Sequence, residues 1–108
     1  MEEPTPAGFR QAAARHLAEG NLNAALHCVL VAGYGYYHLD ESLLDDGTFD
    51  SLCKMLAGRW KEVTSRYKRR VSLADMKAGS TYALHKSRYP LIAKLAAVDL
   101  INQLENKA

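Results

Sequence analysis

The chain has 108 residues, of which 48% are apolar and 24% are charged, and its net charge is +2. This length is typical of one domain, and this composition is typical of a globular protein rather than a disordered one. No apolar run approaches the ~20 residues that a membrane-spanning helix needs. The acidic, proline-bearing start "MEEPTPAG" is unlike a secretory signal. We therefore expect a cytoplasmic protein with no membrane partner.

Opposite charges are concentrated in the two halves of the chain. Residues 1–50 carry two basic and eight acidic side chains, a net charge of −6. Residues 51–108 carry twelve basic and four acidic side chains, a net charge of +8. Such segregation matters more for the choice of partners than the total charge does.

The two cysteines and four histidines show no metal-binding pattern. Cys28 and Cys53 each lie inside an apolar helical pattern, where an isolated cysteine is usually a small core residue. No CxxC or HExxH spacing is present, and the histidines have no metal-ligand spacing. We expect no metal site.

The first half of the chain predicts two helices. Thr5 and Pro6 are typical of an N-cap and a first helical residue, and Gly20 is typical of the residue that ends a helix. A second helix begins at Asn21 or Asn23 and is apolar almost all round, so we expect it at the centre of the fold. It contains Gly33 and Gly35. Since glycine inside a helix costs up to ~1 kcal/mol, these two indicate close packing or a ligand near the backbone.

The second half predicts three more helices. Asp46 is expected to cap a third helix, whose apolar pattern continues through "RWKEVTSRYKRR" toward Arg70. The segment from Ser72 to Asp75 resembles a capping box that starts a short helix, and Pro90 opens a final one. The final helix carries a wide apolar stripe of Leu91, Leu95, Val98, Ile101 and Leu104, whereas "YALHKSRY" is ambiguous between strand and helix. The sequence thus predicts a single all-α domain over 1–108, a small bundle of about five helices.

A family resemblance begins in the second helix. From Tyr36 to Leu56 the chain reads "YYHLDESLLDDGTFDSLCKML", which resembles the N-terminal helical subdomain of bacterial NAD-dependent DNA ligases. That subdomain is the module that closes over the nicotinamide mononucleotide (NMN) half of NAD. The residues that match its pattern without a gap are Tyr36, Tyr37, Asp40, Asp46, Phe49, Asp50, Leu52 and Leu56.

The resemblance implies a nucleotide site. Tyr36 and Tyr37 would offer aromatic faces and hydroxyl groups to the nicotinamide ribotide, and Asp46 and Asp50 would accept hydrogen bonds from it. Phe49 stands where the family has a tyrosine. Aromatic faces attract cations by ~0.5–2 kcal/mol, and carboxylates complete the match to a positively charged nicotinamide ring. NAD or NMN is therefore the implied ligand.

The likeness covers residues from about 21 to 70 and leaves 71–108 as a basic helical extension. Ser42 stands where the family usually has proline, and the chain contains neither a KxDG nucleophile motif nor room for an adenylation domain. The resemblance thus implies a stand-alone, non-catalytic, phage-like module. Its partner would be a nucleotide or a host protein, for example a host enzyme that it modulates.

A structural interpretation of the same residues stays open. Tyrosines at a helix end often bury their rings while their hydroxyls reach water. Asp46 would then be only an N-cap, and Asp50 would favour the positive end of the helix. This account explains each residue separately but does not explain why all of them keep the ligase spacing.

The basic half offers an alternative function. Its cations are interleaved with Trp60 and Tyr67, a pattern typical of single-strand binders that neutralise phosphates and stack bases. This predicts a DNA- or RNA-binding module, although a solvated helix face that pairs with the acidic half is also open. An enzyme acting on NAD is least favoured, because no nucleophile–base pair is visible. The candidate nucleic-acid-binding residues, all within a predicted helix over 59–70, are Arg59, Arg66, Lys68, Arg69 and Arg70.

Overall fold

The computed structural model describes residues 5–105, and all its regular elements in that range are helical. Three short 3₁₀ helices cover 60–62, 66–70 and 86–88. The prediction of a small all-α bundle is confirmed. Glu2 and Glu3, which belong to the acidic start of the chain, lie outside the described residues. The α-helices are α1 (Pro6–Glu19), α2 (Leu22–His38), α3 (Asp46–Gly58), α4 (Leu73–Ala78) and α5 (Leu91–Glu105).

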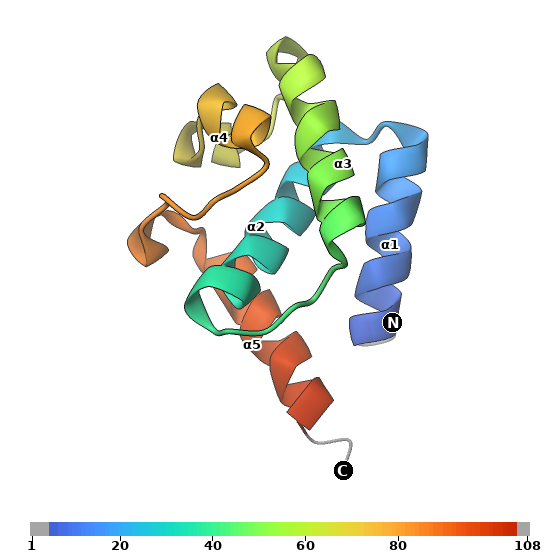
Figure 1. Cartoon of the computed structure of the whole chain (residues 1–108), viewed down its shortest axis with the longest axis vertical. Helices are drawn as coiled ribbons and strands as arrows, with labels where there is room; N and C mark the ends of the chain where they lie inside the picture. Colours follow the sequence, from blue (N-terminus) through green and yellow to red (C-terminus); the bar gives the residue numbers. More distant parts are fainter. Residues whose placement is uncertain (1–4, 106–108) are drawn as a thin grey trace.

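Helix α2 is the centre of the structure, as its apolar composition predicts. It packs against α1, α3 and α5, which surround it (Figure 1). Leu26, Val29, Leu30 and Val31 are fully buried. Within residues 5–105, none of the helices combines the length and the apolar content needed to cross a bilayer.

The predicted helix ends are largely confirmed. The Thr5 hydroxyl accepts a hydrogen bond from the Gly8 N–H at 3.0 Å. Gly20 ends α1 with a φ of 69°, which side-chain-bearing residues rarely adopt. Asn21 caps α2, and Ser72 forms a reciprocal capping box with Asp75 at the start of α4.

Helix α3 is shorter than predicted and ends at Gly58 instead of continuing toward Arg70. The basic segment 59–70 is therefore not one helix, and that prediction is wrong. A contact from far along the sequence interrupts the segment at Thr64 and Ser65. The Asn23 side-chain oxygen accepts hydrogen bonds from the Thr64 and Ser65 N–H groups at 3.0 and 2.9 Å, so these groups do not bond within a helix.

Helix α5 packs with only part of the predicted stripe, because Ile101 is buried and Leu104 is partly buried against the core. Leu91 and Leu95 are 66% and 59% exposed, whereas Ala93 and Ala97 are fully buried. The alanines turn inward because their small side chains let α5 lie close to α2. Since α5 packs against both α2 and α1, it belongs to the same core as the ligase-like region.

A connecting segment crosses α2 at Gly33. A Cβ atom there would overlap the Thr81 hydroxyl, so the glycine is needed for close packing, as predicted. Thr81 is fully buried, and the Tyr89 hydroxyl donates to its backbone and side-chain oxygens at 3.2 and 2.9 Å. Burial raises the pKa of Tyr89 to about 12, so its hydroxyl stays protonated at neutral pH.

We predict that Gly33→Ala destabilises the fold by about 1–3 kcal/mol, because the added methyl group overpacks a site held by the Thr81–Tyr89 hydrogen bonds. Urea denaturation measures the change in the free energy of unfolding. Gly58→Ala is the matched control, since a Cβ there meets no atom within 4 Å. It should stabilise the protein by about 0.5–1 kcal/mol. Equal effects of the two substitutions would contradict the packing at Gly33.

Candidate functional site

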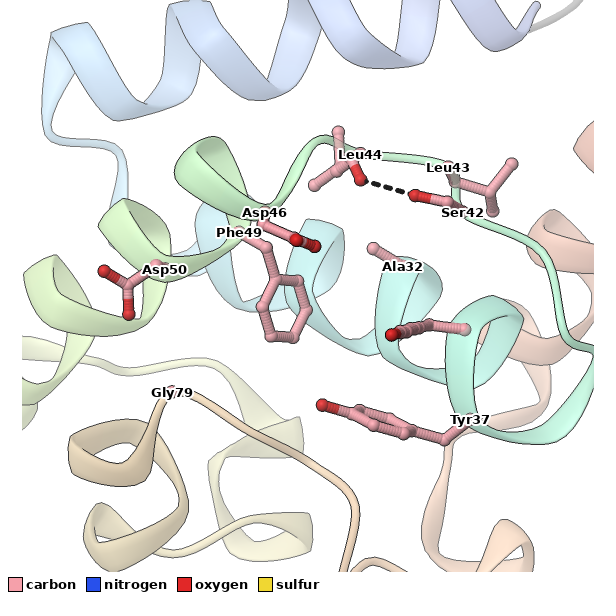
Figure 2. A pocket seen from close by; sticks show the side chains of 10 residues that line it. Ala32, Tyr37, Ser42, Leu43, Leu44, Asp46, Phe49, Asp50 and Gly79 are labelled. Carbon is pink, nitrogen blue, oxygen red and sulfur yellow. Dashed lines mark hydrogen bonds between the residues drawn. The ribbon is translucent and has the colours of Figure 1, made fainter.

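A pocket of about 230 Å³ opens between the end of α2 and the start of α3 (Figure 2). All five residues that the ligase resemblance singles out line this one cavity. The sequence reasoning did not anticipate the other lining residues, which come from α2, from the α2–α3 loop and from the residue after α4. The ten lining residues are Ala32, Tyr36, Tyr37, Ser42, Leu43, Leu44, Asp46, Phe49, Asp50 and Gly79.

The carboxylate that caps α3 is Asp45, not Asp46 as predicted. Asp45 accepts hydrogen bonds from the Thr48 hydroxyl at 2.7 Å and from the Thr48 N–H at 2.9 Å. These bonds hold the pKa of Asp45 below its ordinary value. Asp46 is the first residue of α3, and its exposed carboxylate points over the cavity in Figure 2. It is therefore not required as a cap and is available to a ligand.

The α2–α3 loop is held tightly over the last turns of α2. Asp40 has a φ of 56°, a conformation that aspartate tolerates better than most residues. The Glu41 N–H donates to the Gly35 carbonyl at 2.9 Å, and a Cβ at Gly35 would meet Leu43 at 3.1 Å. The Ser42 hydroxyl donates to the Leu44 carbonyl at 2.9 Å. This bond constrains the loop at the position where the ligase family has proline.

The two tyrosines are arranged differently from the prediction that both offer free faces. Their rings stack on each other, with centroids 4.9 Å apart and planes 16° apart. Tyr37 is fixed further by Ser80, whose hydroxyl lies 3.1 Å from the phenol oxygen, and by an edge contact with Tyr82 at 5.7 Å. Tyr36 is 52% exposed. The Tyr37 ring is thus held rigidly at the edge of the pocket, and the Tyr36 ring covers one face of the Tyr37 ring.

Phe49 and Asp50 occupy different parts of the pocket. The Phe49 ring extends from α3 toward the hydroxyl end of Tyr37, and the gap between them is part of the cavity (Figure 2). The Asp50 carboxylate turns away from Tyr37 in the same view, and it pairs with the Lys54 ammonium at 2.9 Å. Asp46 is therefore the better placed of the two predicted carboxylates.

The chemistry of the lining favours a small cationic ligand with an aromatic ring. Three aromatic side chains and two carboxylates line the cavity, and no basic side chain does. Aromatic faces attract cations, and carboxylates accept hydrogen bonds from hydroxyl groups. The volume is below the ~300–1,000 Å³ usual for ligand pockets. It suits a ring with an attached sugar better than a whole dinucleotide.

His38 supports this region from behind rather than lining it. Its ring packs at 5.5 Å from the Tyr34 ring and 5.3 Å from the Tyr89 ring, measured between centroids. Its Nε2 atom lies 3.2 Å from the Leu84 carbonyl. These contacts join the end of α2 to the segment before α5, which is a structural role.

The predicted nucleic-acid residues differ in the contacts that they already make. Arg59 forms a two-pronged pair with the Glu62 carboxylate at 3.0 and 2.9 Å, so its charge is already neutralised. Lys68 lies 5.1 Å from the Trp60 ring centroid, and Arg66 lies 5.5 Å from that of Tyr67. The Trp60 and Tyr67 rings that were expected to stack on bases are therefore each already in contact with a cation of the same segment.

The other four predicted residues belong to the 3₁₀ helix over 66–70. A cavity of about 150 Å³ is lined by Arg66, Tyr67, Arg69 and Arg70 alone. The recorded ion pairs of residues 5–105 join other residues and none within 66–70. Arg70 donates to the Arg88 carbonyl at 3.3 Å, and Arg88 donates to the Arg69 carbonyl at 3.0 Å. Three arginines thus surround a cavity without a neutralising carboxylate.

The two cysteines are core residues, as predicted. Cys28 and Cys53 are buried and free. Burial raises the pKa of Cys28 to about 11 and that of Cys53 to about 12, so both are unreactive thiols at neutral pH. In the part of the chain that the structure describes, no group of three His, Cys, Asp or Glu side chains is placed to hold a metal ion.

Comparisons of the chain with protein-family models, with curated proteins and with solved structures each gave no significant match. The ligase resemblance therefore stays a proposal that depends on the residues and the pocket described above.

The sequence reasoning missed Ser80 and Gly79. Gly79 lines the pocket and Ser80 contacts the Tyr37 hydroxyl. Both lie more than 40 residues after Tyr37 along the chain, and no local pattern connects the two segments. The only signal was the helix-breaking "KAGST", which indicates a chain reversal but not where the reversed chain packs.

We predict that Asp45→Ala lowers the melting temperature by several degrees, because α3 loses its cap, whereas Asp46→Ala has a much smaller effect. The folded-state pKa of Asp45 is lowered, so its charged form stabilises the protein above the ordinary aspartate pKa of 3.8 and is lost as the pH falls. The difference between wild type and Asp45→Ala should therefore narrow below about pH 4. Thermal melts followed by circular dichroism at neutral and acidic pH provide the measurement. A larger loss of melting temperature for Asp46→Ala than for Asp45→Ala would show that Asp46 is the cap.

Proposed function

We propose that this protein is a non-catalytic binding module whose pocket between α2 and α3 receives the nicotinamide ring and ribose of NMN or NAD. One observation supports the proposal most. The residues that resemble the ligase subdomain, Tyr36, Tyr37, Asp46, Phe49 and Asp50, all line a single cavity. Their side chains converge on one opening from the end of α2 and the start of α3.

The chemistry of the pocket is consistent with this ligand. An oxidised nicotinamide ring is flat and positively charged, and the gap between Tyr37 and Phe49 offers it aromatic surface. The Asp46 carboxylate would accept hydrogen bonds from the ribose hydroxyls. Because no basic side chain lines the cavity, the phosphate would project outside it, on the side where Lys54 pairs with Asp50.

The biological role proposed with this site is modulation of a host enzyme by a phage-like protein. A module that holds a nicotinamide nucleotide without a catalytic nucleophile can sequester the nucleotide. It can also occupy the place of the corresponding subdomain on a larger enzyme. A host protein is therefore a candidate partner beside the nucleotide.

Calorimetric titration with NMN tests the proposal. We expect binding by the wild type and a loss of about fivefold to tenfold in affinity for Asp46→Asn, which removes one charge-assisted hydrogen bond while keeping the shape. Phe49→Tyr restores the hydroxyl of the ligase family and should strengthen binding by a similar factor. Glu19→Gln, which removes an exposed carboxylate of α1, is the matched control and should bind like the wild type.

Adenosine monophosphate, which lacks the nicotinamide ring, should not compete in this titration. The protein used must be folded, as judged by circular dichroism. If neither NMN nor NAD then gives a heat of binding at millimolar concentration, the proposal is contradicted, and the resemblance to the ligase subdomain concerns the fold alone.

We also propose nucleic-acid binding as a second candidate function, because one observation favours it. Arg66, Arg69 and Arg70 surround a cavity and have no recorded ion pair, so their positive charge is available to phosphate groups. Arginine is well suited to this contact, since its planar donor group can bind phosphate oxygens in pairs. Single-stranded DNA or RNA is the candidate ligand, held mainly by its backbone.

Fluorescence anisotropy with a labelled single-stranded oligonucleotide tests this second candidate at several salt concentrations. We expect affinity to fall steeply with salt, and the slope of log K against log salt to decrease by about 0.7 for each phosphate contact removed. Arg69→Ala combined with Arg66→Ala should thus flatten the slope by about 1.4. Lys77→Ala with Lys61→Ala is the control for loss of two charges elsewhere. Equal effects of the two double variants would mean that charge alone, and not this cavity, attracts the nucleic acid.

A further inference from the structure

Helix α5 exposes an apolar stripe that the core does not use. Leu91, Ile92, Leu95 and Val98 are 66%, 54%, 59% and 40% exposed. They lie on the side of the helix opposite to the alanines that pack on α2. Figure 1 shows α5 at the edge of the molecule, with its C-terminal turns extending beyond the other helices. Exposed apolar stripes of this kind indicate an interface.

The spacing of this stripe is that of a coiled-coil seam. Leu91, Leu95, Val98 and Asn102 follow one another at intervals of four, three and four residues, which are alternating d and a positions of a heptad repeat. All four are exposed. The core-facing residues Ala93 and Leu100 then fall at f positions, on the side away from the seam. The helix therefore packs on its own domain with one face and presents the a/d face outward.

The charged residues that flank the seam identify the occupant as a second copy of this chain. Lys94 falls at g and Asp99 at the following e, five residues later. In a parallel pair of helices, g of one chain lies beside the next e of its partner, so Lys94 meets the other Asp99 on both sides of a two-fold axis. An antiparallel pair that joins the whole seam would place Lys94 beside Ile101 of the other copy and Asp99 beside Ile92, so neither charge would have an opposite partner. Asn102 stands at an a position, where asparagine favours two parallel strands in register.

We propose that α5 forms a parallel two-stranded homodimer through the seam of Leu91, Leu95, Val98 and Asn102, with Lys94 of one copy paired to Asp99 of the other. The inference is independent of the proposed nucleotide pocket, since no residue of α5 lines that cavity. The seam covers less than two heptads, which is too short for free peptides. Here α5 is already folded on its domain, so association does not have to form the helix. An interface this small implies a Kd on the order of 10–100 µM.

Sedimentation equilibrium of the whole chain between about 5 µM and 1 mM tests the proposal. The wild type should show a reversible monomer–dimer equilibrium, and Leu95→Glu should remain monomeric over this range. Lys94→Glu and Asp99→Lys should each weaken the dimer at least about tenfold, because each creates two like-charge contacts. Tyr82→Ser, which alters an exposed aromatic residue outside α5, is the control and should leave the association unchanged.

A mixture of the two charge variants gives the sharpest result. In the parallel register, Lys94→Glu and Asp99→Lys chains restore both ion pairs when they associate with each other, so an equimolar mixture should dimerise within about threefold of the wild type. Circular dichroism and thermal melts in dilute solution confirm that each variant is folded, which is expected since the changed residues are not in the core. A wild type that stays monomeric at 1 mM, charge variants that associate as well as the wild type, or a mixture that does not recover would each overturn the proposal.

Discussion

The close approach of the 79–90 segment to the bare backbone of α2 at Gly33 is the constraint on which the rest of the structure depends. Because this position has no Cβ, Thr81 can lie against α2 and receive the Tyr89 hydroxyl, and both residues are fully buried there. The same crossing brings Ser80 to Tyr37 and fixes the aromatic wall of the pocket. One missing methyl group thus couples the central helix, the C-terminal part of the chain and the candidate site.

Local signals in the sequence predicted most of the fold, and long-range contacts account for the errors. Helix ends capped by neighbouring residues, such as Gly20 and the Ser72 capping box, could be read directly. The interruption of the 59–70 segment could not, since it depends on Asn23, which lies 41 residues before Thr64. The burial of α5 was misread for another reason. Apolar residues occur on both sides of this helix, and only its packing on α2 decides that Ala93, Ala97, Leu100 and Ile101 turn inward.

The candidate site was predicted by resemblance, and the structure separates its residues into two kinds. Asp40 adopts a left-handed conformation and Asp45 caps α3, so part of the acidic pattern is what any tight connection between these two helices requires. The side chains of Asp46 and Phe49 make no capping or loop hydrogen bond in the described part of the chain, yet both line the cavity. Residues of this second kind support a ligand site. Asp46 does so most clearly, because it does not have the capping role that the sequence predicted for it.

The segregation of charge along the chain becomes a segregation of surfaces in three dimensions. The pocket at α2–α3 is aromatic and acidic, the cavity over 66–70 is basic, and neither includes a residue of α5. A dimer joined through α5 would therefore leave both cavities open and present two copies of each. A single nucleotide occupies one pocket and gains nothing from a second. A nucleic-acid strand that contacts two basic cavities at once would gain affinity from the raised effective concentration at the second site. Dimerisation would thus favour the nucleic-acid function over the nucleotide function, so the two candidates differ in how their affinities should depend on protein concentration.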